Sequence, residues 1–267
     1  MSEAPQGIPP PPVRPLRERL IDVLLWGGIA AVLIASVGPV NLRRLPMIVS
    51  NSGNLRDLLA AFVHPDIGDM PEFAAEMWLT VQMALWGTFI AVFIAVPLGL
   101  AAARNVSPLW LQQPVRRLLD VLRSLPELII GLAFIVTVGL GPLTGVLALA
   151  INTGGVLGKL FSEAVETVAP GPVEGVRATG ATPLAEIVWG VVPQVAPLWT
   201  SYALYRFESN ARSATVLGFI GAGGIGQLLF SAMQAFQFSQ VAGMVIVIVV
   251  AVTLIDLLSQ AMRSRLI

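Results

Sequence analysis

One polar cluster in the last third of the chain has the residue types and the spacing to bind an anion. Between residues 205 and 213, an arginine, two serines and an asparagine recur three and four positions apart. A helix would place all four on one face, and they are Arg206, Ser209, Asn210 and Ser213. A guanidinium can grip a tetrahedral oxyanion through two hydrogen bonds, and hydroxyl and amide groups add further donors.

The same segment carries a second charged pair. Glu208 and Arg212 lie four positions apart and are expected to form an ion pair along the helix. That pairing leaves Arg206 free to meet another partner. Two other carboxylates in apolar surroundings, Glu127 and Asp256, are expected near helix ends, beside Arg123 and Arg263 respectively.

A glycine-rich stretch matches the dinucleotide-binding fingerprint letter for letter, from Gly221 to Gly226. The fingerprint requires a βαβ unit and an acidic residue about 20 positions later. Here an apolar run follows from Val241, and the next carboxylate is Asp256. A break that bends the backbone or lets helices approach closely is the better interpretation.

A second stretch is similar to a phosphate-binding loop but lacks its spacing. Only three residues separate Gly154 from Gly158, and Leu160 rather than a hydroxyl residue follows Lys159. Small residues four apart favour a close helix contact instead. We therefore expect no ATP site in this chain.

The chain has few of the residue types that other kinds of catalytic site require. The chain has no cysteine, and His64 is its one histidine. Cysteine-ligated metals, disulfides and paired-histidine sites are therefore excluded. We expect no catalytic residue, no bound metal and no cofactor in this chain.

The composition indicates what kind of fold must position these residues. It is the composition of an integral membrane protein. Of 267 residues, 55% are hydrophobic and 12% are charged, with a mean hydropathy of +0.80. Soluble domains contain about 25% charged residues. Sixteen basic residues balance sixteen acidic ones, so no broad cationic surface is present to bind nucleic acid. A lipid bilayer is the expected environment.

Six apolar stretches predict an all-α fold with about six transmembrane helices, because a helix needs about 20 residues to cross the hydrocarbon. Residues 1–19 are proline-rich and predict a cytoplasmic tail, whereas 20–267 form the membrane domain. A cleaved signal peptide is the alternative for the first stretch. The stretches are 20–40, 78–103, 126–140, 143–160, 191–205 and 241–262.

Basic residues predict the orientation, since cytoplasmic loops are enriched in them. In a six-span arrangement, eleven of the sixteen fall on the side of the two termini and five on the other. Both termini are therefore expected in the cytoplasm, with residues 41–77 outside. On this arrangement, Arg206 and its neighbours could equally be anchors at the outer interface.

A polar segment at 163–190 lies on the inner side. Pro172 can begin a helix that ends at Gly180, where a left-handed residue is favoured. Thr182 followed by Pro183 predicts the start of another helix. The pattern predicts two short helices meeting at a glycine, with an ordinary solvated connector as the alternative.

This segment resembles the EAA loop by which permease subunits of ATP-binding-cassette importers dock on their ATPase. The loop pattern is Glu-Ala-Ala, three residues, Gly, nine residues, Ile-x-Leu-Pro, and Glu174, Gly180 and Pro193 stand at the corresponding positions. The chain departs from the pattern at both alanines and at the Ile and Leu, which are replaced by Gly175, Val176, Gly190 and Val192.

Longer stretches resemble the phosphonate-importer permease family, which includes phosphite transporters. The resemblance covers roughly residues 55–265. The stretches of sequence that show the resemblance are residues 97–105, 123–127, 153–159, 193–194, 205–218 and 221–226.

The resemblance implies a type I importer permease in a prokaryotic inner membrane. A second copy of the chain, two or more cytoplasmic ATP-binding subunits and an extracytoplasmic phosphonate-type binding protein would be its partners, with ATP and Mg²⁺ on the ATPase. Glu174 and Arg177 would contact the ATPase, and Gly180 would supply the turn. An importer for another small substrate is the alternative. An ion-coupled transporter would need a midplane carboxylate and an internal repeat, and neither is visible.

Overall fold

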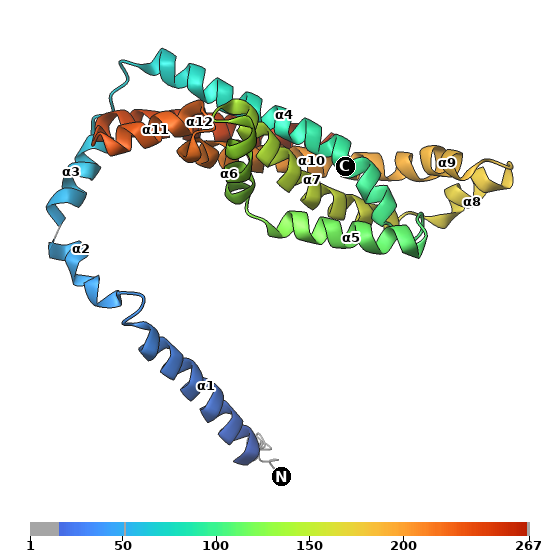
Figure 1. Ribbon diagram of the computed structural model, residues 1–267, viewed down its shortest axis with the longest axis horizontal. Coiled ribbons are helices and arrows are strands. Elements are labelled where there is room, and N and C mark those ends of the chain that lie inside the picture. The colour runs from blue at the N-terminus through green and yellow to red at the C-terminus, as the bar shows by residue number, and fades with distance from the viewer. Residues whose placement is uncertain (1–15, 51, 266–267) are drawn as a thin grey trace, which may run out of the picture. The chain divides into compact units, whose positions relative to one another are not determined.

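The computed structural model describes residues 16–50 and 52–265, and helices with short turns account for them (Figure 1). No strand occurs within these two ranges. The chain divides into two compact units, residues 1–59 and 60–267. The all-α fold class is confirmed.

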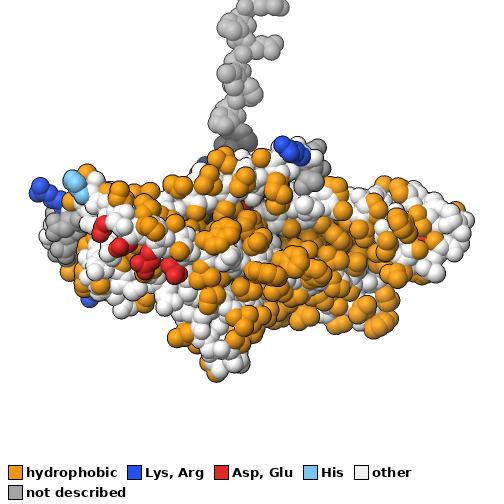
Figure 2. Space-filling model, turned by 90° about the horizontal axis from the view of Figure 1, so that it is seen from above, with side chains coloured by type: hydrophobic (Ala, Val, Ile, Leu, Met, Phe, Trp, Pro, Cys, Tyr) orange, Lys and Arg blue, Asp and Glu red, His pale blue; other side chains and the backbone are white. Residues whose placement is uncertain are grey.

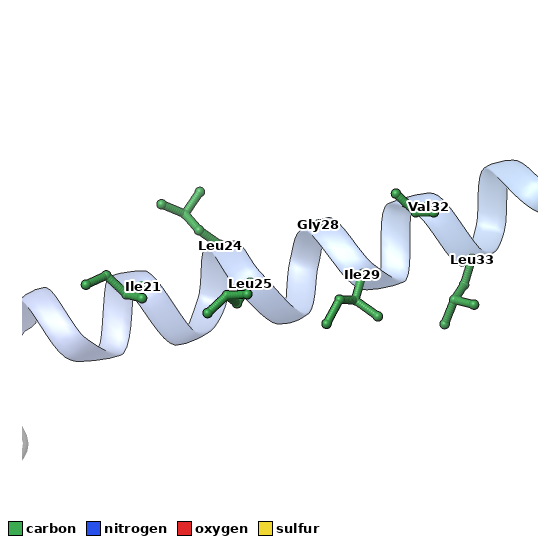
Figure 3. A pocket seen from close by; sticks show the side chains of 7 residues that line it. All are labelled: Ile21, Leu24, Leu25, Gly28, Ile29, Val32 and Leu33. Carbon is green, nitrogen blue, oxygen red and sulfur yellow. The ribbon is translucent and has the colours of Figure 1, made fainter. Parts of the chain in front are cut away.

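In the first unit, α1 (Leu16–Ser36) is the expected first span, displaced by four residues toward the N-terminus. Helices η1 (Leu42–Arg44) and α2 (Pro46–Ser50) follow it, and the boundary between the two units falls within α3 (Ser52–Val63). Apolar side chains such as Leu24, Ile29 and Leu33 project from α1 along its length (Figure 3). Because the helix already begins at Leu16, only residues 1–15 of the predicted tail remain, and these lie outside the described residues.

The second unit contains the remaining long helices. Those long and apolar enough to cross a membrane singly are α4 (Met70–Ala102), α7 (Pro142–Glu166) and α12 (Phe238–Arg263). Together with α1 they make four candidate spans, or up to six if two bent helix pairs each count as one. The predicted six spans match that upper count.

One of the bent pairs corrects a predicted span. The stretch 126–140 forms only the 12-residue helix α6 (Glu127–Val138), which is too short to cross the hydrocarbon by itself. It bends by 92° from the amphipathic α5 (Leu109–Ser124). Helix α5 ends before the extended Leu125, which precedes Pro126, and α6 ends at Gly139, which has φ +92°.

Glycines allow α7 to approach its neighbours closely. A Cβ on Gly158 would lie 2.7 Å from Cδ2 of Leu119 in α5, and one on Gly154 would lie 3.3 Å from Cγ2 of Ile94 in α4. The interpretation of Gly154 and Gly158 as a helix contact is confirmed. In hydrocarbon this close packing is what holds helices together.

The second bent pair joins α10 (Val192–Leu217) to α11 (Gly224–Gln234) through η3 (Gly218–Ile220) with a 47° bend. Gly221, Gly223 and Gly224 all have positive φ, where residues with a Cβ are strained. The glycine-rich break is confirmed, and it connects helices rather than a strand to a helix.

The interior of the second unit contains three clusters of buried apolar side chains. Phe161 and Trp199 stack with ring centroids 4.7 Å apart, tying α7 to α10.

Figure 2 shows apolar side chains over much of one face, whereas acidic ones gather at the end where α3 leads into α4. The acidic residues of this region are Asp66, Asp69, Glu72 and Glu76.

We expect Gly226→Ala to destabilise the chain, because a Cβ there would overlap the carbonyl oxygen of Thr215 in α10. Overpacking of this kind costs about 1 to 3 kcal/mol. Gly171→Ala is the control, since nothing lies within 4 Å of its Cβ position. Equal thermal unfolding midpoints of the two variants in detergent would contradict the close contact.

Candidate functional site

A polar cavity of about 350 Å³ lies among α5, α6, α7 and α10. Three of the four residues predicted to share one face of α10 line it: Arg206, Ser209 and Ser213. The other walls come from the end of α5, the start of α6 and the middle of α7. They are formed by Arg123, Ser124, Leu125, Pro126, Glu127, Asn152 and Val156.

Arg206 contributes a half-buried guanidinium with unused donor capacity. Its Nη2 donates to Oδ1 of Asn152 at 3.4 Å and to Oγ1 of Thr153 at 3.2 Å. Its Nε is buried and has no hydrogen-bond partner. An unpaired buried donor is costly, so the guanidinium of Arg206 would gain from a further hydrogen-bond partner.

Asn210 lies behind the cavity rather than in its wall. Its Oδ1 accepts from Oγ1 of Thr153 at 2.8 Å, and its Nδ2 donates to Oγ1 of Thr88 at 2.9 Å. The side chain is 1% exposed. Asn210 thereby links α4, α7 and α10, and it reaches Arg206 through Thr153.

The expected pair of Glu208 and Arg212 forms, with 2.9 Å between Oε1 and Nη2. Glu208 is buried, and it has a second cation that the sequence did not indicate. Nη2 of Arg263 in α12 lies 3.6 Å from its Oε2. Arg263 thus pairs with Glu208, not with Asp256, whose carboxylate accepts hydrogen bonds from Gln260.

Glu127 brings a carboxylate into the cavity, near Arg123 as expected. Its Oε1 accepts from Oγ of Ser213 at 2.9 Å, a contact between residues 86 positions apart. The hydrogen bond joins α6 to α10. Local spacing gives no signal for such a pairing, and sequence analysis missed it.

The loop at 163–190 folds as two short helical segments around a glycine. Helix α8 (Pro170–Ala178) begins two residues before the predicted Pro172, and Gly180 has φ +79° as its position predicted. Helix α9 (Pro183–Ala185) follows, and Oγ1 of its N-cap Thr182 accepts from the amide of Ala185 at 3.4 Å. A π-helical turn, η2 (Glu186–Val191), then leads into α10.

An ion pair within the loop holds α8 against η2. Arg177 makes a bidentate contact with Glu186, with Nη2 to Oε2 at 2.8 Å and Nε to both carboxylate oxygens at 3.1 Å. This hydrogen bonding raises the pKa of Arg177 above its ordinary value. Arg177 therefore has an internal partner, whereas Glu174 is exposed on α8.

Close packing and a side-chain bridge complete the loop. A Cβ on Gly190 would lie 3.0 Å from Cα of Val173, so glycine lets η2 touch α8. The Gln194 amide accepts from the backbone N–H of Ala169 at 3.0 Å and donates to its carbonyl at 3.3 Å. Pro193 lies in the first turn of α10.

These contacts make the loop, α10 and the cavity one connected structure. The fold resembles that of the inward-facing MetNI methionine ABC transporter, with a TM-score of 0.68 and 20% identity over 76% of this chain and 99% of that chain. At that identity the likeness shows the fold alone. The fold class is thus that of a type I ABC importer permease.

Sequence comparison gives the family. Residues 95–267 match the binding-protein-dependent transport system inner membrane component, and the chain belongs to this family. It is 38% identical over 88% of its length, and 86% of the relative's, to the phosphite transport system permease protein PtxC of Stutzerimonas stutzeri. It is 60% identical over 45% of its length to PhnE2 of Escherichia coli (strain K12), covering 99% of that protein. The name of PhnE2 describes a cryptic phosphonate transport system permease assigned by inference. The chain is therefore a permease subunit of an ABC importer.

We expect Asn210→Ala to lower stability by about 1 to 3 kcal/mol, because Thr88 and Thr153 each lose a buried hydrogen-bond partner. Thr253→Ala is a matched control, since that hydroxyl donates only to the carbonyl of Val249 in its own helix. Thermal unfolding in detergent measures both. Equal midpoints would show that the buried network contributes nothing.

We expect Glu186→Gln to loosen α8, because an amide cannot reproduce the charged bidentate contact with Arg177. Amide hydrogen exchange at residues 170–178 should become several-fold faster. Glu72→Gln, in α4, should leave that exchange unchanged. If the two variants exchange alike at 170–178, the ion pair does not hold the loop.

Proposed function

We propose that this chain is the membrane-spanning subunit of an importer that moves phosphonate, or a related phosphorus oxyanion such as phosphite, into the cytoplasm. The observation that carries the proposal is the polar cavity with Arg206 in its wall. Arg206 brings a guanidinium with an unpartnered Nε into a space also lined by Ser209 and Ser213. The names of the relatives agree with such a cargo.

The cavity chemistry suits a tetrahedral anion. Guanidinium nitrogens offer planar, charged donors, and the serine hydroxyls can turn to donate to the remaining oxygens. Glu127 opposes an anion by its charge, which limits how tightly the cavity holds one. A site in a transport path must release its cargo as well as bind it.

The partners follow from the family and from the loop. A second copy of this chain, two or more cytoplasmic ATPase subunits that hold ATP and Mg²⁺, and an extracytoplasmic binding protein would complete the importer. The loop containing α8 and α9 would dock on the ATPase, with both chain termini on the same cytoplasmic side. Glu174, exposed on α8, is the better candidate for a direct contact, because Arg177 is engaged by Glu186.

The docking loop would transmit ATPase closure by rigid-body movement. Helix α8 is tied to η2 by Arg177, and Gln194 ties the segment before α8 to the start of α10. A displacement of α8 would therefore reach α10, which carries Arg206. This chain would supply the passage, and the partner would supply hydrolysis.

We expect Gly180→Val to uncouple transport from ATP hydrolysis, because a β-branched residue resists the φ of +79° at this turn. The complex should still assemble and hydrolyse ATP while uptake falls. Uptake and ATPase activity are measured on the same proteoliposomes. Gly175→Ala, in the α8 helix with open space around it, is the control. Wild-type uptake by Gly180→Val would remove the turn from the coupling route.

We expect Arg206→Ala to reduce uptake of phosphonate or phosphite by tenfold or more, on the order of 1.4 kcal/mol of lost anion stabilisation. Arg206→Lys should recover part of the loss, because a point charge lacks the planar fork. The binding protein's own affinity should not change. Arg117→Ala is the control, since its side chain is 81% exposed on α5.

The measurement is uptake into proteoliposomes that contain equal amounts of assembled complex. Wild-type uptake by Arg206→Ala would assign Arg206 to anchoring at the membrane interface instead. If the wild-type complex takes up a different anion and neither phosphonate nor phosphite, the proposed cargo is wrong but the proposed site stands.

A further inference from the structure

A second polar cavity adjoins the first along the contact between α5 and α7. It has a volume of about 420 Å³ and is lined by side chains of both helices. Arg123, Ser124 and Val156 line both cavities. Because these three residues line both cavities, the two spaces adjoin, and together they are called the α5–α7 groove.

The groove runs toward the docking loop. Along α7 it is lined first by Asn152, then by Val156, and then by Lys159 and Glu163. The eleven helical steps from Asn152 to Glu163 extend about 16.5 Å at the rise of 1.5 Å per residue. The far end lies three residues before the end of α7, from which the chain passes into α8.

Three cations follow one another along the groove: Arg206, Arg123 and Lys159. The two nearer the loop have carboxylate partners on their own helices. Nε of Arg123 lies 3.3 Å from Oδ1 of Asp120, and Nζ of Lys159 lies 3.9 Å from Oε1 of Glu163. Within the described residues, no carboxylate oxygen comes within 4.0 Å of the Arg206 guanidinium. Of these three cations, Arg206 is therefore the one without a described carboxylate partner.

We propose that the α5–α7 groove is the exit route of the transported anion, with Arg123 and Lys159 as successive contact points after Arg206. This inference rests on the proposed function, because it takes the cargo to be an oxyanion. At each step the anion replaces a carboxylate partner, Asp120 at Arg123 and Glu163 at Lys159. The sites differ from Arg206 in having a resident carboxylate that can displace the cargo again.

Weak pairing is the property that makes such a route work. Partly exposed ion pairs at helical spacing are readily exchanged, since solvent screens them. A passage conducts when each site binds strongly enough to admit the ion and weakly enough to release it. The longer of the two pairs, Lys159 with Glu163 at 3.9 Å, lies nearest the exit.

The absence of cysteine from the chain gives a direct test, because one introduced thiol is the only one in this subunit. Val156→Cys places it in the wall shared by both cavities. In inside-out vesicles containing the full complex, an anionic, membrane-impermeant methanethiosulfonate should label it several-fold faster than a cationic one. The preference would come from Arg206, which has no carboxylate partner in the described ranges, and from Arg123, whose partly exposed pair with Asp120 is readily exchanged.

Leu257→Cys is the control, since Leu257 is an exposed apolar side chain of α12 outside the groove. It should show no preference for the anionic reagent. Adding Arg123→Gln to the Val156→Cys variant should abolish the preference while the thiol stays reactive. Labelling of Val156→Cys that is no faster than that of Leu257→Cys, or that is equal for both reagents, would overturn the exit route.

Transport separates this inference from the proposed function. Arg123→Gln and Lys159→Gln should each slow uptake at least threefold without lowering ATPase activity, whereas Arg117→Gln on the outer side of α5 should not. Loss of uptake in Arg206→Ala with normal uptake in both groove variants would reject the exit route alone. Anion-selective labelling without phosphonate or phosphite uptake would keep the route and reject the cargo.

Discussion

Close approach of α7 to α4 and α5 is the constraint on which the rest of the second unit depends. Helices surrounded by lipid gain little from the hydrophobic effect, so contact and hydrogen bonding must hold them together. Gly154, Gly155 and Gly158 remove the side chains that would keep the helices apart. With α7 and α4 close together, Asn210 of α10 hydrogen-bonds to both, through Thr153 on α7 and Thr88 on α4.

The same packing explains why the cavity beside Arg206 is polar although the chain is so apolar. Buried polar groups persist where each finds a partner, and Asn152, Thr153 and Asn210 satisfy one another or the backbone. Asn152 donates to the carbonyl of Leu125, where the chain turns between α5 and α6. The network thus fixes the kink that opens the cavity and orients the arginine within it.

Local patterns predicted the features that depend on neighbouring residues. Apolar runs indicated most spans, the spacing of Arg206, Ser209 and Ser213 indicated a shared face, and Gly180 indicated a left-handed turn. Contacts between distant residues carried no such signal. The pairing of Arg263 with Glu208 depends on how α12 packs against α10, and the pairing of Ser213 with Glu127 depends on a 92° bend. The run at 126–140 looked like a span because hydropathy does not register the effect of Pro126 and Gly139 on length.

The π-helical turn η2 stands between the docking loop and the helix that carries the cavity arginine. A π turn holds one residue more than the α-helical turn it replaces, and it is commonly found where function requires it. Since each residue of an α-helix turns the chain by about 100°, that single residue sets which way the whole of α10 faces. Deleting the extra residue of the π turn would rotate α10 so that Arg206 faces a different part of the structure. The sequence of α10 itself would be unchanged. The six residues from Glu186 to Val191 therefore set the rotational orientation of α10, although they lie outside the groove that depends on it.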